Sequence, residues 1–141
     1  MGKQELDNLV KIGSLKAEAP SRKEFDDMVA SARLSLADAQ NEDLETDSQF
    51  TLAYGAAHRF ALAALRYHGY RSNNRRDVVF QTLVHTLGTD KADVQTFLKA
   101  HNERNLAEYE GRLDIEEKLV AGLIVATKRL ESAIGKLTPL S

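Results

Sequence analysis

Apolar side chains recur along most of the chain at intervals of three and four residues, the spacing that places them on one face of an α-helix. The clearest run lies between residues 50 and 68, where two neighbouring apolar rows are rich in alanine. A helix that is apolar on two sides usually lies at the centre of a helical protein, so we expect a central helix here. The first row is Phe50, Ala53, Tyr54, Ala57, Ala61, Ala64, Leu65 and His68, and the second is Leu52, Ala56, Phe60 and Ala63.

The same spacing predicts two helices before this segment. A short helix over 3–15 is expected to end near Gly13. A second helix begins at Ser21, where Glu24, three residues further on, completes a capping box. The polar and acidic stretch 41–47 then reads as a loop.

Three further helices are expected in the second half of the chain. One covers about 75–87 and is ended by Gly88. The next runs from Asp90 to Gly111, and the last begins at Asp114 with an acidic first turn. No segment shows the alternation typical of a strand. The pattern therefore predicts an all-α, up-and-down bundle of five to six helices. We expect a single domain over 1–141, with its core at about 47–137 and the first helix as an accessory.

Composition agrees with a globular helical protein, since 43% of the residues are hydrophobic and 28% are charged. Cysteine is absent, which excludes disulfides and thiolate metal sites. The four histidines, His58, His68, His85 and His101, are scattered over three expected helices, so we expect no metal and no cofactor. The charged N-terminus lacks the apolar run of a signal peptide, and no stretch is long enough to span a membrane. We expect a cytoplasmic protein without a membrane partner.

Positive charge is concentrated in one part of the chain. The net charge is −2, but the segment 48–76 has five arginines and no acidic residue. A basic segment interleaved with Tyr67 and Tyr70 favours contact with phosphate or RNA. Alternatively, these arginines solubilise an alanine-rich helix and pair with acids from other helices. The residues expected to contact phosphate are Arg66, Arg71, Arg75 and Arg76.

A polar stripe continues the apolar face of the expected helix over 90–111. With Val94, Phe97 and Leu98 marking the buried side, the polar residues that follow point the same way. Half-buried polar groups cost about 1–3 kcal/mol each unless they are paired. They therefore belong either to a structural network, at a dimer seam or with His58 and Tyr54, or to a shallow site for a ligand. The expected ligand-binding or dimer cleft comprises His58, His101, Arg104, Asn105, Glu108 and Tyr109.

Four segments of the chain resemble the HEPN family, the higher eukaryote and prokaryote nucleotide-binding domains. The similarity is to the small, stand-alone prokaryotic members and extends from Asp47 to the end of the chain. The segments are Ala53–His58, Ala61–Leu65, Gly69–Tyr70 and Arg104–Tyr109.

The resemblance implies a homodimer and, in many members, a metal-independent ribonuclease. The family motif is an arginine, a polar residue that is often asparagine, three further residues and a histidine. Here Arg104 and Asn105 match the motif, but Tyr109 stands at the histidine position. Tyrosine is a poor general base at neutral pH. The sequence is thus similar to a branch whose motif ends in an acidic residue and tyrosine, for which we do not assume cleavage.

We therefore expect a HEPN-like binding module for a nucleotide, RNA or a partner protein. The resemblance implies a minimal nucleotidyltransferase as a candidate partner within a toxin–antitoxin system. One alternative is an active ribonuclease toxin that uses Arg104 with a displaced histidine, His101 or His58. A second alternative is a non-enzymatic dimeric scaffold.

Overall fold

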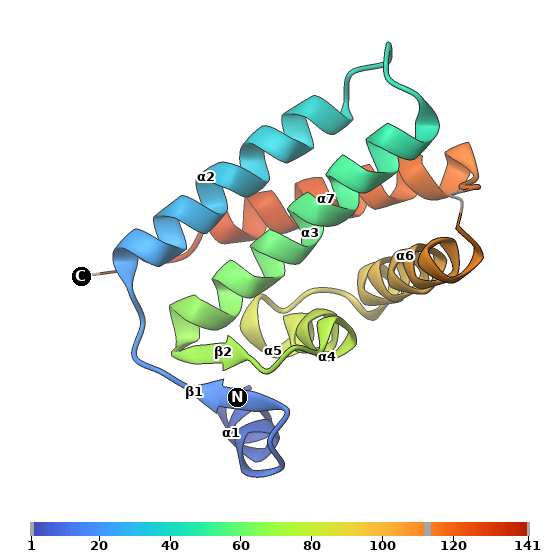
Figure 1. Cartoon of the computed structure of the whole chain (residues 1–141). Helices are drawn as coiled ribbons and strands as arrows, with labels where there is room; N and C mark the ends of the chain where they lie inside the picture. Colours follow the sequence, from blue (N-terminus) through green and yellow to red (C-terminus); the bar gives the residue numbers. More distant parts are fainter. Residues whose placement is uncertain (1, 112–113, 141) are drawn as a thin grey trace.

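Helix α3 (Thr46–His68) lies at the centre of the fold and packs against most of the other elements (Figure 1). The computed structural model describes residues 2–111 and 114–140. The expectation of an all-α helical bundle is confirmed. The remaining elements are α1 (Lys3–Lys11), β1 (Leu15–Ala17), α2 (Arg22–Ala39), β2 (Tyr70–Ser72), α4 (Arg76–Gln81), α5 (Leu83–Thr86), α6 (Lys91–Glu110) and α7 (Glu117–Gly135).

The alanines of α3 explain its central place. Small side chains let neighbouring helices approach closely, and α2 and α7 both lie along α3 (Figure 1). The expected apolar rows are buried, with the exception of His68 in the last turn and the half-buried Leu52. The fully buried alanines are Ala53, Ala56, Ala57, Ala61, Ala63 and Ala64.

A two-stranded antiparallel sheet corrects the expectation of a chain without strands. The first helix ends at Lys11, close to its expected end at Gly13, whose φ is +83°. The chain then runs beside the segment after α3, with Leu15 opposite Ser72 and Ala17 opposite Tyr70. Strands of three residues are too short for an alternating pattern to be recognised, which is why the sequence did not indicate them.

The first turn of α2 shows half of the expected capping box. The Ser21 hydroxyl accepts the backbone N–H of Glu24 at 3.2 Å. The Glu24 carboxylate, instead of closing the box, accepts Nε of Arg66 at 2.5 Å and also pairs with Arg71. Helix α2 is therefore fixed to α3 and β2 by charge as well as by packing.

The expected helix over 75–87 is divided into α4 and α5. The hydroxyl of Thr82 donates to the carbonyl of Val79 at 2.7 Å, and the next turn tightens, with the N–H of His85 bonded to the carbonyl of Thr82. Gly88, with φ of +66°, ends α5 as expected.

The starts of the last two long helices differ in their capping from the expectation. Helix α6 follows Asp90, whose side chain makes no capping hydrogen bond. Glu116 and not Asp114 occupies the N-cap position of α7, and its side chain also makes no capping hydrogen bond, while the preceding Ile115 is buried in the core. None of the helices in the described residues combines the length and the apolar composition that crossing a bilayer requires.

Candidate functional site

Two polar residues of α6, His101 and Arg104, lie against α3 because they are on the buried side of α6. Phe97 is fully buried, and His101 and Arg104 follow it at the four- and seven-residue spacings of one helix face. Both side chains are half-buried. Beyond them the helix leaves the core, and Tyr109 is 90% exposed.

Hydrogen bonds fix the orientation of His101. The hydroxyl of Tyr54 on α3 lies 3.0 Å from Nδ1, and the side-chain amide of Asn105 lies 3.2 Å from Nε2. An amide nitrogen can only donate, so Nε2 accepts and Nδ1 carries the proton that is donated to Tyr54. Burial lowers the pKa of His101, consistent with this neutral form. The hydroxyl of Tyr54 keeps its own hydrogen for a further acceptor.

Two arginines lie over the ring of Tyr54. The guanidinium carbon of Arg104 is 5.4 Å from the ring centroid, and that of Arg76, from the start of α4, is 5.7 Å away. Both are within the range of a cation–π interaction. The ring is held by stacking on Phe50 and by an edge contact with Phe80. Tyr54 is therefore a fixed support on which two cations from different helices converge.

His58, one turn after Tyr54 on α3, lies beside the same cations. Burial lowers its pKa to about 4, and the charges of Arg76, Arg104 and Arg59 act in the same direction. His58 is thus uncharged at neutral pH.

The charges of this region are incompletely balanced. Arg104 pairs with Glu108 at 3.1 Å. Within the described residues, Arg76 has no carboxylate partner at ion-pair distance, and Arg59 donates to the Ser35 hydroxyl at 2.8 Å. The region therefore carries a surplus of positive charge in a half-buried setting. We call Tyr54, His58, Arg76, His101, Arg104 and Asn105 the α3–α6 patch.

The structure brings together most of the residues expected in the cleft. His58, His101, Arg104 and Asn105 belong to the patch, and Glu108 reaches it through its ion pair with Arg104. Tyr109 lies outside the patch, on the exposed last turns of α6. Helical spacing places Tyr109 near the polar stripe, but the core that the stripe faces ends before it.

The four arginines expected to contact phosphate do not form one surface. Arg66 is only 2% exposed, and its guanidinium donates to Glu24 and to the carbonyls of Glu18, Ala19 and Tyr70. A cation bonded in this way is structural, which corrects the expectation for Arg66. The remaining ion pairs join Arg71 to Glu18 and Glu24, and Arg75 to Asp77.

Arg76 is the arginine that joins the patch. Sequence reasoning did not separate it from Arg75, because pairing partners are a property of the tertiary structure. The one signal in the sequence is Asp77, two residues after Arg75, which is bonded to Arg75 at 2.7 Å while Arg76 lies over Tyr54 of α3.

The patch offers donors and few groups that could exchange protons. Two guanidinium groups, the tyrosine hydroxyl and the asparagine amide can donate to an anion, whereas both histidines have lowered pKa values. No group of three His, Asp or Glu side chains in the described part of the chain could hold a metal ion.

The fold and this arrangement define an all-α bundle with a cation-rich polar patch between α3, α4 and α6. Comparison of the chain with protein-family models, with curated proteins and with solved structures finds no match. The function is therefore inferred from the patch and from the sequence resemblance.

Proposed function

We propose that the chain is a HEPN-like binding module and that its α3–α6 patch binds a phosphate group of a nucleotide or of RNA. The observation that carries this proposal is the convergence of Arg76 and Arg104 on the ring of Tyr54. Guanidinium groups suit phosphate because their planar donors match two of its oxygens.

The patch favours recognition of phosphate over recognition of a base. Tyr54 is buried and its ring contacts two arginines and two phenylalanines, so no face of it is available for a stacked base. Binding through phosphate alone carries little sequence information. We therefore expect weak dependence on base identity and strong dependence on salt.

A homodimer, a nucleotidyltransferase partner and a toxin–antitoxin role are parts of the same proposal, and they rest on the resemblance to HEPN proteins. A dimer with α6 at its seam would bring two copies of Arg104 into one cleft. The exposed end of α6, where Tyr109 lies, is available for such a contact.

The ribonuclease alternative rests on the presence of His101 beside Arg104, since both contact Tyr54. Cleavage through the 2′-hydroxyl would need a histidine that gains and loses a proton near neutral pH. The lowered pKa values of His101 and His58 oppose this role. Binding is therefore the better supported activity.

The proposal is tested by measuring the anisotropy of a short, fluorescein-labelled oligouridylate with wild-type protein and Arg104→Gln. We expect the substitution to weaken binding about tenfold, the equivalent of about 1.4 kcal/mol for a charge-assisted hydrogen bond. Arg22→Gln is the matched control, because Arg22 is an exposed arginine on α2, outside the patch. Equal affinities for wild type and Arg104→Gln would contradict the proposal.

Assays of RNA cleavage, growth and binding separate the three functions. RNA cleavage by wild type, lost in Arg104→Ala and His101→Ala, together with growth arrest on expression, would establish the ribonuclease. Binding without cleavage supports the binding module. Absence of binding to both the oligouridylate and adenosine monophosphate would leave the scaffold as the remaining function.

A further inference from the structure

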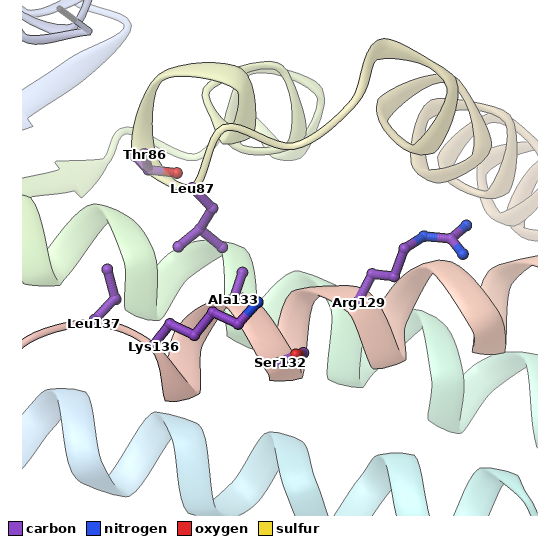
Figure 2. Close-up of a pocket in the computed structure, with 7 residues that line it drawn as sticks. All are labelled: Thr86, Leu87, Arg129, Ser132, Ala133, Lys136 and Leu137. Atoms are coloured by element: carbon purple, nitrogen blue, oxygen red, sulfur yellow. The ribbon is translucent and has the colours of Figure 1, made fainter.

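A second concave region lies on another side of the bundle, between α5 and α7. It has a volume of about 500 Å³, within the usual range of small-molecule sites. Figure 2 shows Thr86 and Leu87 on the α5 side and the remaining lining residues along the last turns of α7 and the segment that follows it. We call this region the α5–α7 groove. It shares no residue with the α3–α6 patch. The remaining lining consists of Arg129, Ser132 and Ala133 on α7, and of Lys136 and Leu137 just after its end.

The groove is amphipathic along α7. Arg129, Ser132 and Ala133 are spaced by three and four positions, so they lie on one face of α7, and Lys136 and Leu137 follow at its end. Leu87, Ala133 and Leu137 supply apolar surface, while Ser132 and Lys136 supply a hydroxyl and a cation. Such a lining matches a ligand that has an apolar body and a charged end.

Thr86, which lines the groove, has a buried hydroxyl without a hydrogen-bond partner in the described residues. The residue is 6% exposed, and its Oγ1 is the one buried side-chain polar atom without a hydrogen-bond partner in the described residues. Its carbonyl is satisfied by Nε2 of His68 at 2.9 Å, so the hydroxyl alone is unpaired. A buried hydroxyl without a partner costs about 1–3 kcal/mol, and Thr86 belongs to the lining of the groove.

Charge indicates which kind of ligand fits. Arg129 is already bonded to both carboxylate oxygens of Asp93, at 2.7 and 2.8 Å, and is also close to Asp90. Lys136 has no carboxylate at ion-pair distance in residues 2–111 and 114–140. The groove therefore lacks one negative charge, which a monoanion would supply.

We propose that the α5–α7 groove binds a small amphiphilic monocarboxylate. The carboxylate lies at Lys136 and accepts hydrogen bonds from the hydroxyl groups of the groove, and the hydrocarbon body covers Leu87, Ala133 and Leu137. A phosphate dianion fits less well, since the groove offers a single unbalanced cation beside an apolar wall. The site is independent of the α3–α6 patch and of the function proposed for it.

Three probes with one hydrocarbon chain test the proposal: octanoate, octanol and octylammonium, each titrated into isotopically labelled protein and followed by NMR. We expect saturable shifts at groove residues with octanoate. Octanol should bind about tenfold more weakly and octylammonium should not bind there, because only the carboxylate pairs with Lys136. Absence of binding by octanoate, or equal binding by all three probes, would overturn the proposal.

Substitutions locate the site. Lys136→Gln should weaken octanoate binding about tenfold, since it removes the cation. Lys128→Gln, an exposed lysine on the same helix outside the groove, is the matched control and should not change it. Thr86→Val preserves the shape of the side chain and removes the hydroxyl, so affinity should fall while the fold is kept. Unchanged affinity in both Lys136→Gln and Thr86→Val would show that the groove is not the site.

Discussion

Replacing His58 with glutamine should remove a pH dependence of stability that the patch creates. Burial next to Arg76, Arg104 and Arg59 lowers the pKa of His58 to about 4, whereas a histidine in the unfolded chain titrates near 6.5. Between about pH 6.5 and pH 4, the histidine therefore binds a proton in the unfolded chain and remains largely unprotonated in the folded protein. This contribution is fully present above pH 6.5 and is lost as the pH falls towards 4.

The size of the effect follows from the two pKa values. A difference of about 2.5 units corresponds to about 3 kcal/mol in full, of which about 2 kcal/mol is lost between pH 7 and pH 5. His101, whose pKa is also lowered, is present in both proteins, so the difference between wild type and His58→Gln isolates the contribution of His58. The free energy of unfolding should consequently fall with pH more steeply in wild type than in His58→Gln.

Urea denaturation followed by circular dichroism at several pH values measures this difference. His85→Gln, a histidine on α5 outside the patch, serves as the control for the loss of any histidine. The difference between wild type and His58→Gln should decline by about 2 kcal/mol from pH 7 to pH 5. A difference that stays constant within about 0.5 kcal/mol would refute the placement of an uncharged His58 among these arginines.

Five further substitutions test the fold by urea denaturation. Arg66→Met should lower the free energy of unfolding by about 3–5 kcal/mol, because the Glu24 carboxylate and three carbonyl oxygens lose the guanidinium that donates to them. A loss under about 1 kcal/mol would contradict the structural role of Arg66. Ala61→Leu should cost about 1–3 kcal/mol by overfilling the buried side of α3, whereas Ala30→Leu on the exposed side of α2 should change stability by less than about 0.5 kcal/mol. Gly69→Ala should cost about 1–2 kcal/mol because φ is +92°, whereas Gly122→Ala, where an added methyl group meets open space within α7, should stabilise by about 0.5–1 kcal/mol.

The sequence predicted those helices in which buried residues recur every three or four positions. The alanine-rich rows of α3 predicted a central helix, and counting from Phe97 placed His101 and Arg104 towards the core. The same counting could not show that the core ends before Tyr109, because periodicity gives the direction of a side chain and not the point where the core ends. The strands at Leu15–Ala17 and Tyr70–Ser72 are held by pairing with each other, and their three residues carry no pattern of their own.

The sequence could not predict which charged side chains pair with each other. Arg66, Arg71, Arg75 and Arg76 are alike in sequence, and only the tertiary structure assigns the first three to carboxylates and the last to Tyr54. The alternative that these arginines pair with acids from other helices is correct for Arg66 and Arg71 and does not apply to Arg76. The α5–α7 groove was also beyond prediction, since it depends on a hydroxyl left without a partner by packing.

The central claim is that the α3–α6 patch binds phosphate through arginines held over Tyr54. Its most direct test compares two neighbouring residues with the same charge, Arg76→Gln and Arg75→Gln, by the dissociation constant of the labelled oligouridylate at one salt concentration. Arg76 lies over the Tyr54 ring, whereas Arg75 is bound to Asp77 and exposed. We predict about a tenfold loss of affinity for Arg76→Gln and a much smaller change for Arg75→Gln. Equal losses for the two variants, or no loss for Arg76→Gln, would contradict the assignment of the site.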